Sequence, residues 1–372
     1  MSWTLIQSDA ELSGVVARLD QCSELAVDTE FMRRNTYNPQ IGLLQLCADD
    51  EAFLIDPLTV SDLDGLRQLL ASPSVVKVLH SCSEDLEVFR HWLGVLPEPL
   101  IDTQRAAALL GESFGLGYRA MVEKLRGIAL DKGETRSDWL RRPLSESQCH
   151  YAALDVLELL PVWRLLRQRA EDQGRIPWLL EDGREARAAL AEREAGLYRR
   201  IKGSGRLNAR QMEVLRRVVD WREERARRLD KPRGWILDDK ACLAIAREMP
   251  RRLEALGTID QLPPAVLNRQ GRALLGLVGD AMDVPADELP EPAPAVLNPE
   301  QRKLLKDLRE HLRALAEDLR IAPEAALSGA ELELLVRETN GADVEAPARW
   351  SGWREEAVLK PLRSKLRESR QA

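Results

Sequence analysis

Two carboxylates stand one residue apart in the stretch LAVDTEFMRR, residues 25–34. The apolar run before them predicts a buried strand, and residues i and i+2 of a strand point to the same face. Asp28 and Glu30 therefore repel each other unless a positive charge lies between them. Because such pairs also occur on solvated strand ends, these two residues alone do not define a site.

Two further segments carry acids in positions that favour a shared site. HSCSEDLEVF, residues 80–89, puts Asp85 in the first turn of a helix directly after a buried strand, a frequent location for α/β active sites. HYAALDVLELL, residues 150–160, puts Tyr151 and Asp155 four residues apart on one helix face. An aspartate in an otherwise apolar helix is costly unless a cation pairs with it.

Together the four carboxylates have the chemistry of a two-metal site. Two Mg²⁺ or Mn²⁺ ions need hard oxygen ligands and roughly four negative charges. Such a pair of ions stabilises both the attacking and the leaving oxygen in phosphodiester hydrolysis. We expect Asp28, Glu30 and Asp155 to bind one ion, Asp28 and Asp85 to bind the second, and Tyr151 to orient the attacking water. Asp28 should be less replaceable than Glu30.

The elements around these residues predict an α/β or α+β domain with a mixed sheet over residues 1–170. Strand-like and helix-like runs alternate, with a hairpin expected across Asp49 and Asp50. Ser145, with Gln148 three residues later, forms a capping-box pattern that begins one long helix through CHYAALDVLELLPVWRLL. His80 is expected to be a hydrogen-bonded structural residue, and Asp102 to cap the helix that follows it.

An internal repeat of 90 residues follows, in a part of the chain that reads as helical. Asn208 and Asn298 each cap a helix with Gln three residues later, and Pro299 occupies the first helical position of the second copy. The Pro-rich stretch DVPADELPEPAPAVLNP separates the copies. The predicted organisation is the α/β domain over 1–170, a helical connector over 171–206, a helical domain over 207–284, a linker over 285–296 and a second helical domain over 297–372.

Charge differs between the two copies. Residues 208–248 carry a net charge of +3 and residues 298–338 a net charge of -2, within a chain of net charge -7. Contact with phosphate is therefore expected in the first copy. The candidate substrate-binding cations are Arg33, Arg34, Lys202, Arg206 and Arg210. Trp221 and Trp235 are expected to pack in the core of that copy.

Composition restricts the location of the protein. No run of about 18 apolar residues is present, so no membrane span is expected. The five cysteines show no C-x-x-C pair and no disulfide framework. We expect a cytoplasmic monomer.

Three motifs carry a resemblance to a known family. AVDTEF, HSCSEDLEVF and YAALD resemble the exonuclease motifs of the DEDD superfamily in its tyrosine subclass, and YNPQIGLLQL, LIDTQRAAALLG and RSDWLRRPLSESQ resemble bacterial ribonuclease D. The helical copies resemble HRDC domains. This resemblance implies an RNase H-like exonuclease domain, followed by two HRDC-like domains, that trims RNA with a 3′ single-stranded end, tRNA precursors above all, from 3′ to 5′ and releases nucleoside 5′-monophosphates.

Three alternatives stay open. His150 also fits the H-x-x-x-x-D pattern of the histidine subclass, but it lies about 140° from Asp155 around the helix, against about 40° for Tyr151. We favour Tyr151. The same constellation would serve a DNA exonuclease, since contacts to a 2′-hydroxyl cannot be read from the sequence. A non-catalytic nucleic-acid adaptor is the third alternative, although it would have no need for four repelling carboxylates.

Overall fold

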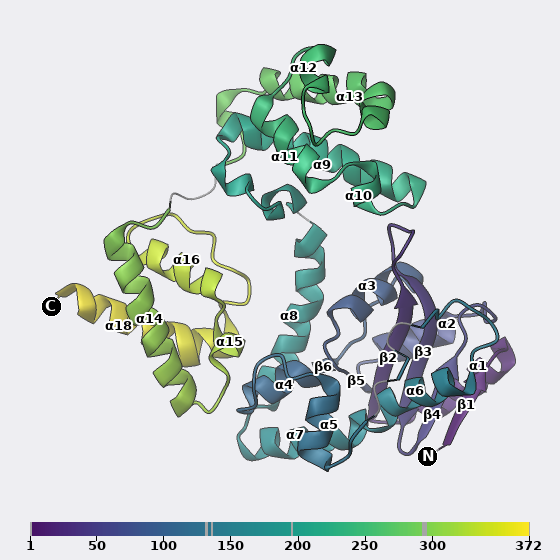
Figure 1. Cartoon of the computed structure of the whole chain (residues 1–372). Coiled ribbons are helices and arrows are strands. Elements are labelled where there is room, and N and C mark those ends of the chain that lie inside the picture. The colour runs from purple at the N-terminus through teal and green to yellow at the C-terminus, as the bar shows by residue number, and fades with distance from the viewer. Residues whose placement is uncertain (1, 131–132, 135–136, 195, 292–295, 372) are drawn as a thin grey trace. The chain divides into compact units, whose positions relative to one another are not determined.

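The computed structural model describes residues 2–130, 133–134, 137–194, 196–291 and 296–371. The chain divides into two compact units. The first contains residues 1–32, 41–188 and 297–372, and the second contains residues 33–40 and 189–296. Figure 1 shows the helices and strands of both units.

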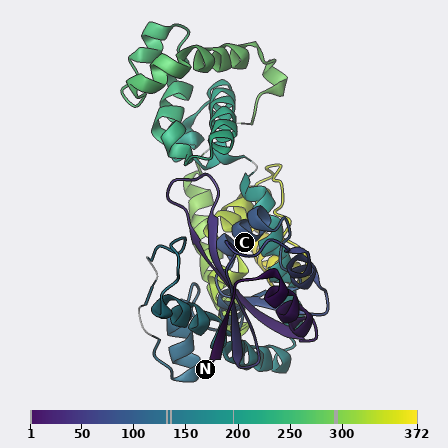
Figure 2. The ribbon, with the colours of Figure 1, turned by 90° about the vertical axis from the view of Figure 1, so that its right-hand side faces the viewer.

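A six-stranded sheet is the centre of the first unit, in the order β1-β4-β3-β2-β5-β6. Its strands are β1 (Ser2–Ile6), β2 (Glu24–Met32), β3 (Gln40–Ala48), β4 (Glu51–Ile55), β5 (Val76–Leu79) and β6 (Leu100–Asp102). β1 pairs in parallel with β4, and β5 pairs in parallel with β2 and β6, whereas β3 and β4 are antiparallel. The predicted mixed sheet is confirmed, and Figure 2 shows it after a quarter turn.

The predicted hairpin is also confirmed. Only Asp49 and Asp50 connect β3 to β4. Asp49 has a φ of 62°, a left-handed conformation that two-residue hairpin turns require and that aspartate tolerates. The turn aligns Ala48 with Glu51 and so fixes the register of the two strands.

Eight helices surround the sheet or lead away from it among the described residues. They are α1 (Asp9–Leu19), α2 (Asp64–Ala71), α3 (Ser83–Trp92), α4 (Thr103–Leu109), α5 (Tyr118–Arg126), α6 (Glu146–Leu157), α7 (Leu159–Asp172) and α8 (Ile176–Glu194). The prediction of one long helix from Ser145 is wrong, because α6 ends before α7 begins at Leu159. Pro161 explains the break: its ring lacks an N–H and is tolerated only in the first turn of a helix, which is its position in α7.

The second unit is helical among its described residues. It contains α9 (Ala209–Leu229), α10 (Arg233–Ile236), α11 (Asp239–Glu248), α12 (Leu253–Gly257) and α13 (Pro264–Asp283), with short 3₁₀ turns at Leu197–Arg200, Ser204–Arg206 and Ala286–Glu288. Asn208 and Gln211 form the predicted capping box at the start of α9. One apolar cluster, which includes Leu215, Cys242 and Leu274, forms the core of this unit.

The repeat of 90 residues appears again in the helices of residues 297–371. These are α14 (Pro299–Asp318), α15 (Pro323–Ala326), α16 (Gly329–Thr339), α17 (Gly352–Arg354), a π-helical turn at Glu355–Leu359, and α18 (Lys360–Gln371). α14, α15 and α16 start 90 residues after α9, α10 and α11. The apolar residues of this segment share one core with residues of the sheet, α4, α6 and α7.

Ion pairs hold this C-terminal segment against the rest of the first unit. The fully buried Arg354 pairs with Asp182 at 3.0 Å and with Glu185, both on α8. Asp182 also accepts from Arg105 of α4 at 2.6 Å. The boundaries between the sheet domain and the helical domains stay a prediction.

Two further observations concern membrane spans and cysteines. None of the helices in the described ranges is both long and apolar enough to cross a membrane. Each of the five cysteines carries a free thiol.

Candidate active site

One cavity of about 620 Å³ in the first unit is lined by all five of the residues singled out as catalytic. Asp28 and Glu30 come from β2, Asp85 from the first turn of α3, and Tyr151 and Asp155 from α6. The remaining lining residues are Thr29, Phe31, His80, Ser81, Glu84, Gly117, Tyr118, Arg119, Ala120 and Leu159.

Alternation along β2 directs the first two acids into the cavity. Asp28, Glu30 and Asp155 each offer a carboxylate oxygen, and these three oxygens lie within 4.8 Å of one another. Asp85 is buried nearby, where its carboxylate accepts a hydrogen bond from the hydroxyl of Thr29. β2 thus contributes two acids and also the hydroxyl that holds a third.

The helix α6 positions Tyr151 and Asp155 on one face. Its start is fixed by the capping box of Ser145 and Gln148, which satisfies backbone N–H groups of the first turn. Tyr151 interacts with Asp155 and lowers the pKa of its carboxyl group. His150, one residue earlier, is exposed and is not among the residues that line the cavity.

The ring of Tyr151 is held by its neighbours. Its centroid lies 6.2 Å from that of Trp139. On another side lies Gly133, where a Cβ would come within 2.5 Å of the tyrosine ring. Trp139 is fixed in turn by the backbone of Gly42 and by Arg142, which donates to the Trp139 carbonyl at 2.8 Å and pairs with the buried Asp56. The ring of Tyr151 therefore has little room to rotate.

Burial and mutual repulsion raise the pKa values of the carboxyl groups. Burial, then the charges of Asp155 and Asp85, raise the pKa of Glu30 to about 9. Burial raises the pKa of Asp155 to about 7, although Tyr151 and Arg119 oppose the change, and raises that of Asp85 to about 6, against the hydrogen bond from Thr29. The pKa of Asp28 lies well above its ordinary range for the same reasons, burial first.

This donor set fits divalent cations. It consists of oxygen ligands with no thiolate or imidazole, and its charges are under-compensated by the protein. Cations at this position would remove both the repulsion and the raised pKa values.

The sequence did not single out one segment that lines the cavity together with these acids. Gly117, Tyr118, Arg119 and Ala120 lie at the start of α5 and line the cavity. Among the residues that the structure describes, Arg119 is the only arginine or lysine in the lining, and its charge lowers the pKa of Asp155. GLGYR does not have the spacing of a phosphate-binding loop, and an arginine gives no periodic signal, so neither feature revealed it.

Two expectations about neighbouring residues are confirmed. Nδ1 of His80 lies 3.0 Å from the hydroxyl of Thr103. Asp102 caps α4, where it accepts from the backbone N–H groups of Gln104 and Arg105. Asp102 also accepts from the N–H groups of Ser81 and Cys82, at 2.9 and 3.1 Å, so the same carboxylate fixes the loop that leads to Asp85.

The five candidate substrate-binding cations belong to the second unit and are not among the residues that line the cavity. Arg33 and Arg34 are exposed. Arg210 donates to the carbonyls of Ala281 and Val284 at 2.7 and 2.6 Å, so its guanidinium stabilises the end of α13. For Lys202 and Arg206, which are exposed, contact with a substrate stays a prediction.

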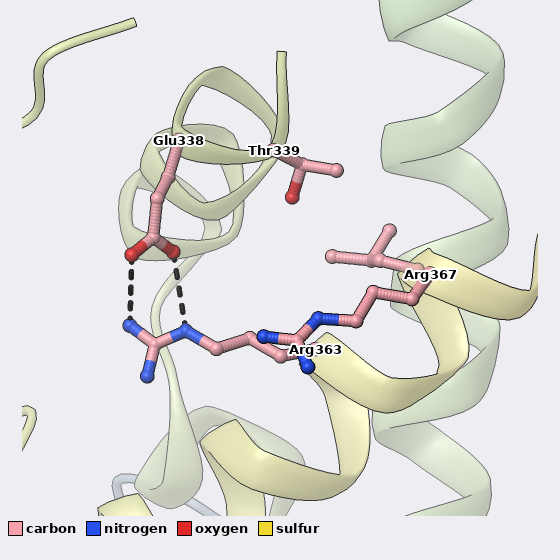
Figure 3. Close-up of a pocket in the computed structure, with 5 residues that line it drawn as sticks. Glu338, Thr339, Arg363 and Arg367 are labelled. Carbon is pink, nitrogen blue, oxygen red and sulfur yellow. Dashed lines mark hydrogen bonds and ion pairs between the residues drawn. The ribbon is translucent and has the colours of Figure 1, made fainter. Parts of the chain in front are cut away.

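A second cavity, of about 480 Å³, lies between α16 and α18 (Figure 3). It is lined by Glu338, Thr339, Arg363, Leu366 and Arg367. Arg363 pairs with Glu338 at 3.0 Å and with Glu355 at 3.0 Å, so its charge is balanced by protein carboxylates. This lining has no cluster of acids comparable to that in the first cavity.

A mixed sheet with acids on β2 and on two flanking helices is the arrangement that the resemblance to 3′-5′ exonucleases implies. The family model described as 3'-5' exonuclease matches residues 3–171, and the one described as HRDC domain matches residues 211–278. Over 97% of its length the chain is 42% identical to ribonuclease D of Pseudomonas paraeruginosa, of which it covers 96%. It is 39% identical to ribonuclease D of Escherichia coli, with 78% of each chain covered.

A solved structure gives the same result. The crystal structure of Escherichia coli RNase D, described as an exoribonuclease involved in structured RNA processing, superposes with a TM-score of 0.88 at 36% identity, covering 99% of both chains. The chain therefore belongs to the ribonuclease D family of 3′-5′ exoribonucleases.

Proposed function

We propose that this protein trims the 3′ ends of tRNA precursors and other small structured RNAs, with Asp28, Glu30, Asp85, Tyr151 and Asp155 as its active-site residues. One observation carries the assignment: these five residues line a single cavity, and three of them offer oxygens within 4.8 Å of one another. The cytoplasmic location and the monomeric state stay predictions from the sequence.

Two divalent cations, Mg²⁺ or Mn²⁺, are the proposed cofactors. Asp28, Glu30 and Asp155 would hold one, and Asp28 and Asp85 would hold the other. Bound there, such ions lower the pKa of a water molecule and stabilise the oxygen that leaves the phosphate. The raised pKa values of these carboxyl groups support the assignment, because ligands that repel one another gain most when a cation binds.

Tyr151 has a role that follows from its own chemistry. Burial and three carboxylates raise the pKa of its hydroxyl above the ordinary value, so it stays protonated at neutral pH and cannot act as a base. The hydroxyl also interacts with Asp155 and lowers the pKa of that carboxyl group. The lone pairs of its oxygen remain available to accept a hydrogen bond from the attacking water and so to orient it. Water then forms a bond to phosphorus and gives up a proton to solvent, while the bond from phosphorus to the 3′ oxygen of the preceding nucleotide breaks. That oxygen takes up a proton from solvent, and the terminal nucleotide leaves as a nucleoside 5′-monophosphate.

Arg119 supplies the positive charge that a phosphate requires. It lies in the lining of the cavity with the acids and is partly buried, so its charge is less screened than that of a surface arginine. We assign it to the phosphate of the terminal nucleotide, which guides the substrate into a cavity that is otherwise acidic.

The test is hydrolysis of labelled RNA by the purified protein with Mg²⁺, with Mn²⁺ and with a chelator. Three substrates are compared: a tRNA precursor with a 3′ extension, an unstructured RNA, and DNA of the same sequence. Release of 5′-monophosphates from RNA, abolished by the chelator and by Asp28→Asn, is the expected result. Glu84→Gln is the matched control, because this exposed acid borders the same cavity and should be dispensable. Full activity of Asp28→Asn would overturn the site.

A further inference from the structure

An exposed tryptophan lies among cations on the second unit. Trp235, on α10, is 62% exposed, and Leu229, at the end of α9, is 46% exposed. The expectation that Trp235 packs in the core is therefore wrong, whereas Trp221 does pack against it. The short sequence LDKPRGW turns the chain away from α9 before α10 has enough residues to bury an apolar face.

The surroundings of Trp235 carry uncompensated positive charge. Nζ of Lys231 lies 5.9 Å from the centroid of the indole ring. Arg228 and Lys231 are exposed, and in the part of the chain that the structure describes they form no ion pair, whereas the guanidinium of Arg227 lies over the ring of Tyr37 at 5.4 Å. The indole ring is thus bordered by the exposed cation of Lys231, and Arg228 lies three residues earlier in the chain.

The nearby acids, in contrast, are occupied by partners within the protein. Asp230 accepts from the backbone N–H of Tyr37 at 3.0 Å. Asp238 caps α11, accepting from the N–H of Ala241 at 2.7 Å. Asp239 pairs with Arg222 at 2.7 Å. Of these three acids Asp239 is paired with a cation, whereas the carboxylates of Asp230 and Asp238 are held in place by backbone N–H groups.

The backbone that carries Trp235 is fixed from below. Arg222 is buried beneath it and donates to the carbonyl of Leu237 as well as to Asp239. The N–H of Trp235 itself donates to the carbonyl of Pro232 at 2.8 Å. The exposed ring therefore stands on an anchored turn and not on a loose loop.

The internal repeat supplies a comparison within the same chain. A shift of 90 residues moves Trp235 to Ala325, Lys231 to Ile321 and Arg228 to Asp318. Ala325 and Ile321 are both buried. The aromatic ring and its cations are consequently a property of the first copy alone and do not follow from the fold of the repeat.

We propose that Trp235 stacks on an unpaired base of RNA and that Arg228 and Lys231 bind the adjoining phosphates. A single-stranded nucleic acid offers the two chemistries that this surface matches, a π face for the indole and a negative backbone for the cations. The proposal rests on the proposed function, since it assumes that RNA is the substrate.

The experiment measures the affinity of the full chain for a single-stranded RNA oligonucleotide labelled at its 5′ end, in the Asp28→Asn background so that the probe survives. Trp235→Ala should weaken binding by about 5- to 150-fold, the range that loss of one stacked base gives. Trp235→Phe should restore most of the affinity. Leu229→Ala is the matched control, because it removes an exposed apolar side chain from the same corner without removing a π face, and it should have no effect.

Two further measurements separate stacking from a general defect. Binding of a blunt RNA duplex should be insensitive to Trp235→Ala, because its bases are already stacked. In the double variant Arg228→Ala with Lys231→Ala, the slope of the logarithm of Kd against the logarithm of salt concentration should fall by about 1.4. Each phosphate contact of a single strand contributes about 0.7 to this slope. Equal losses on single-stranded and duplex RNA, or no loss at all, would overturn the proposal.

The outcome for the proposed function is read independently. Hydrolysis of RNA tests the exonuclease assignment, and it is measured with the unsubstituted protein, which has both Asp28 and Trp235. A protein that releases 5′-monophosphates but binds RNA equally well without Trp235 refutes only the stacking site. A protein that releases none refutes the assignment itself.

Discussion

Replacing Asp155 by asparagine should make the metal-free protein more stable while it destroys activity. The pKa of Asp155 rises from an ordinary value of 3.8 to about 7. Between these two values the folded state retains a proton that the unfolded state has lost, so stability falls as the pH rises through this window. Above about pH 7 the whole cost of ionising the group is present. Asparagine removes that cost and keeps the shape of the side chain.

The size of the effect follows from the shift. At about 1.4 kcal/mol per pKa unit, ionising Asp155 costs up to about 4 kcal/mol. Because the side chain of Asp155 is only partly buried, solvent screens its charge. We therefore expect Asp155→Asn to raise the free energy of unfolding by about half of this cost, about 2 kcal/mol. For a unit of this size the gain corresponds to a rise of about 4 to 8 °C in melting temperature at pH 8. At pH 5 the gain should be much smaller.

Thermal unfolding measures this directly, with a chelator and with Mg²⁺ at both pH values. With the chelator, the melting temperature of the unsubstituted protein should fall from pH 5 to pH 8 more steeply than that of Asp155→Asn. Mg²⁺ should remove much of the difference by stabilising only the protein with its full set of carboxylates. Glu84→Gln serves as the control and should follow the unsubstituted protein. Parallel pH curves for the unsubstituted protein and Asp155→Asn would refute the electrostatic account of the site.

Two other predictions concern the helix α6 and the C-terminal segment. Tyr151→Phe removes one hydroxyl and should lower the rate of a single turnover by about 100-fold or more. His150→Ala should keep full activity, because His150 is exposed. The opposite pattern would transfer the role of Tyr151 to His150. Arg354→Met removes a buried partner of Asp182 and Glu185 and should lower the free energy of unfolding in urea by about 3 kcal/mol. Lys360→Met breaks an exposed ion pair with Glu356 and should lower it by less than about 0.5 kcal/mol. An unchanged midpoint for Arg354→Met would contradict the idea that this network holds the C-terminal segment.

Local patterns predicted the parts of the fold that depend on neighbours in sequence. The capping boxes at Ser145, Asn208 and Asn298 each begin a helix, and the two-residue hairpin lies at Asp49 and Asp50. The spacing of Tyr151 and Asp155 placed both on one helix face for the same reason. Pro161 was the missed local signal, since a proline inside a helical pattern should have marked a break.

Contacts between distant residues could not be predicted in this way. The pair of Asp182 and Arg354 spans 172 residues, and nothing in either segment alone names the other. The same holds for Thr29 and Asp85, whose hydrogen bond joins two of the recognised motifs. The exposure of Trp235 could not be predicted either, because a tryptophan between helices most often packs inward. The geometry of the turn at Trp235 exposes this side chain to solvent.

The two copies of the repeat differ because each packs against something different. In the second copy, the N–H of Ala322 donates to the carbonyl of Ala108 on α4 at 2.8 Å. Arg175 bridges the same two elements by donating to the carbonyls of Leu109 and Arg320. Cations at the start of α15 would be buried by these contacts, so alanine and isoleucine stand there. The corresponding surface of the first copy is open to solvent at Trp235. Adding an aromatic ring and lysines to the second copy would therefore break its packing on α4 before it created another site.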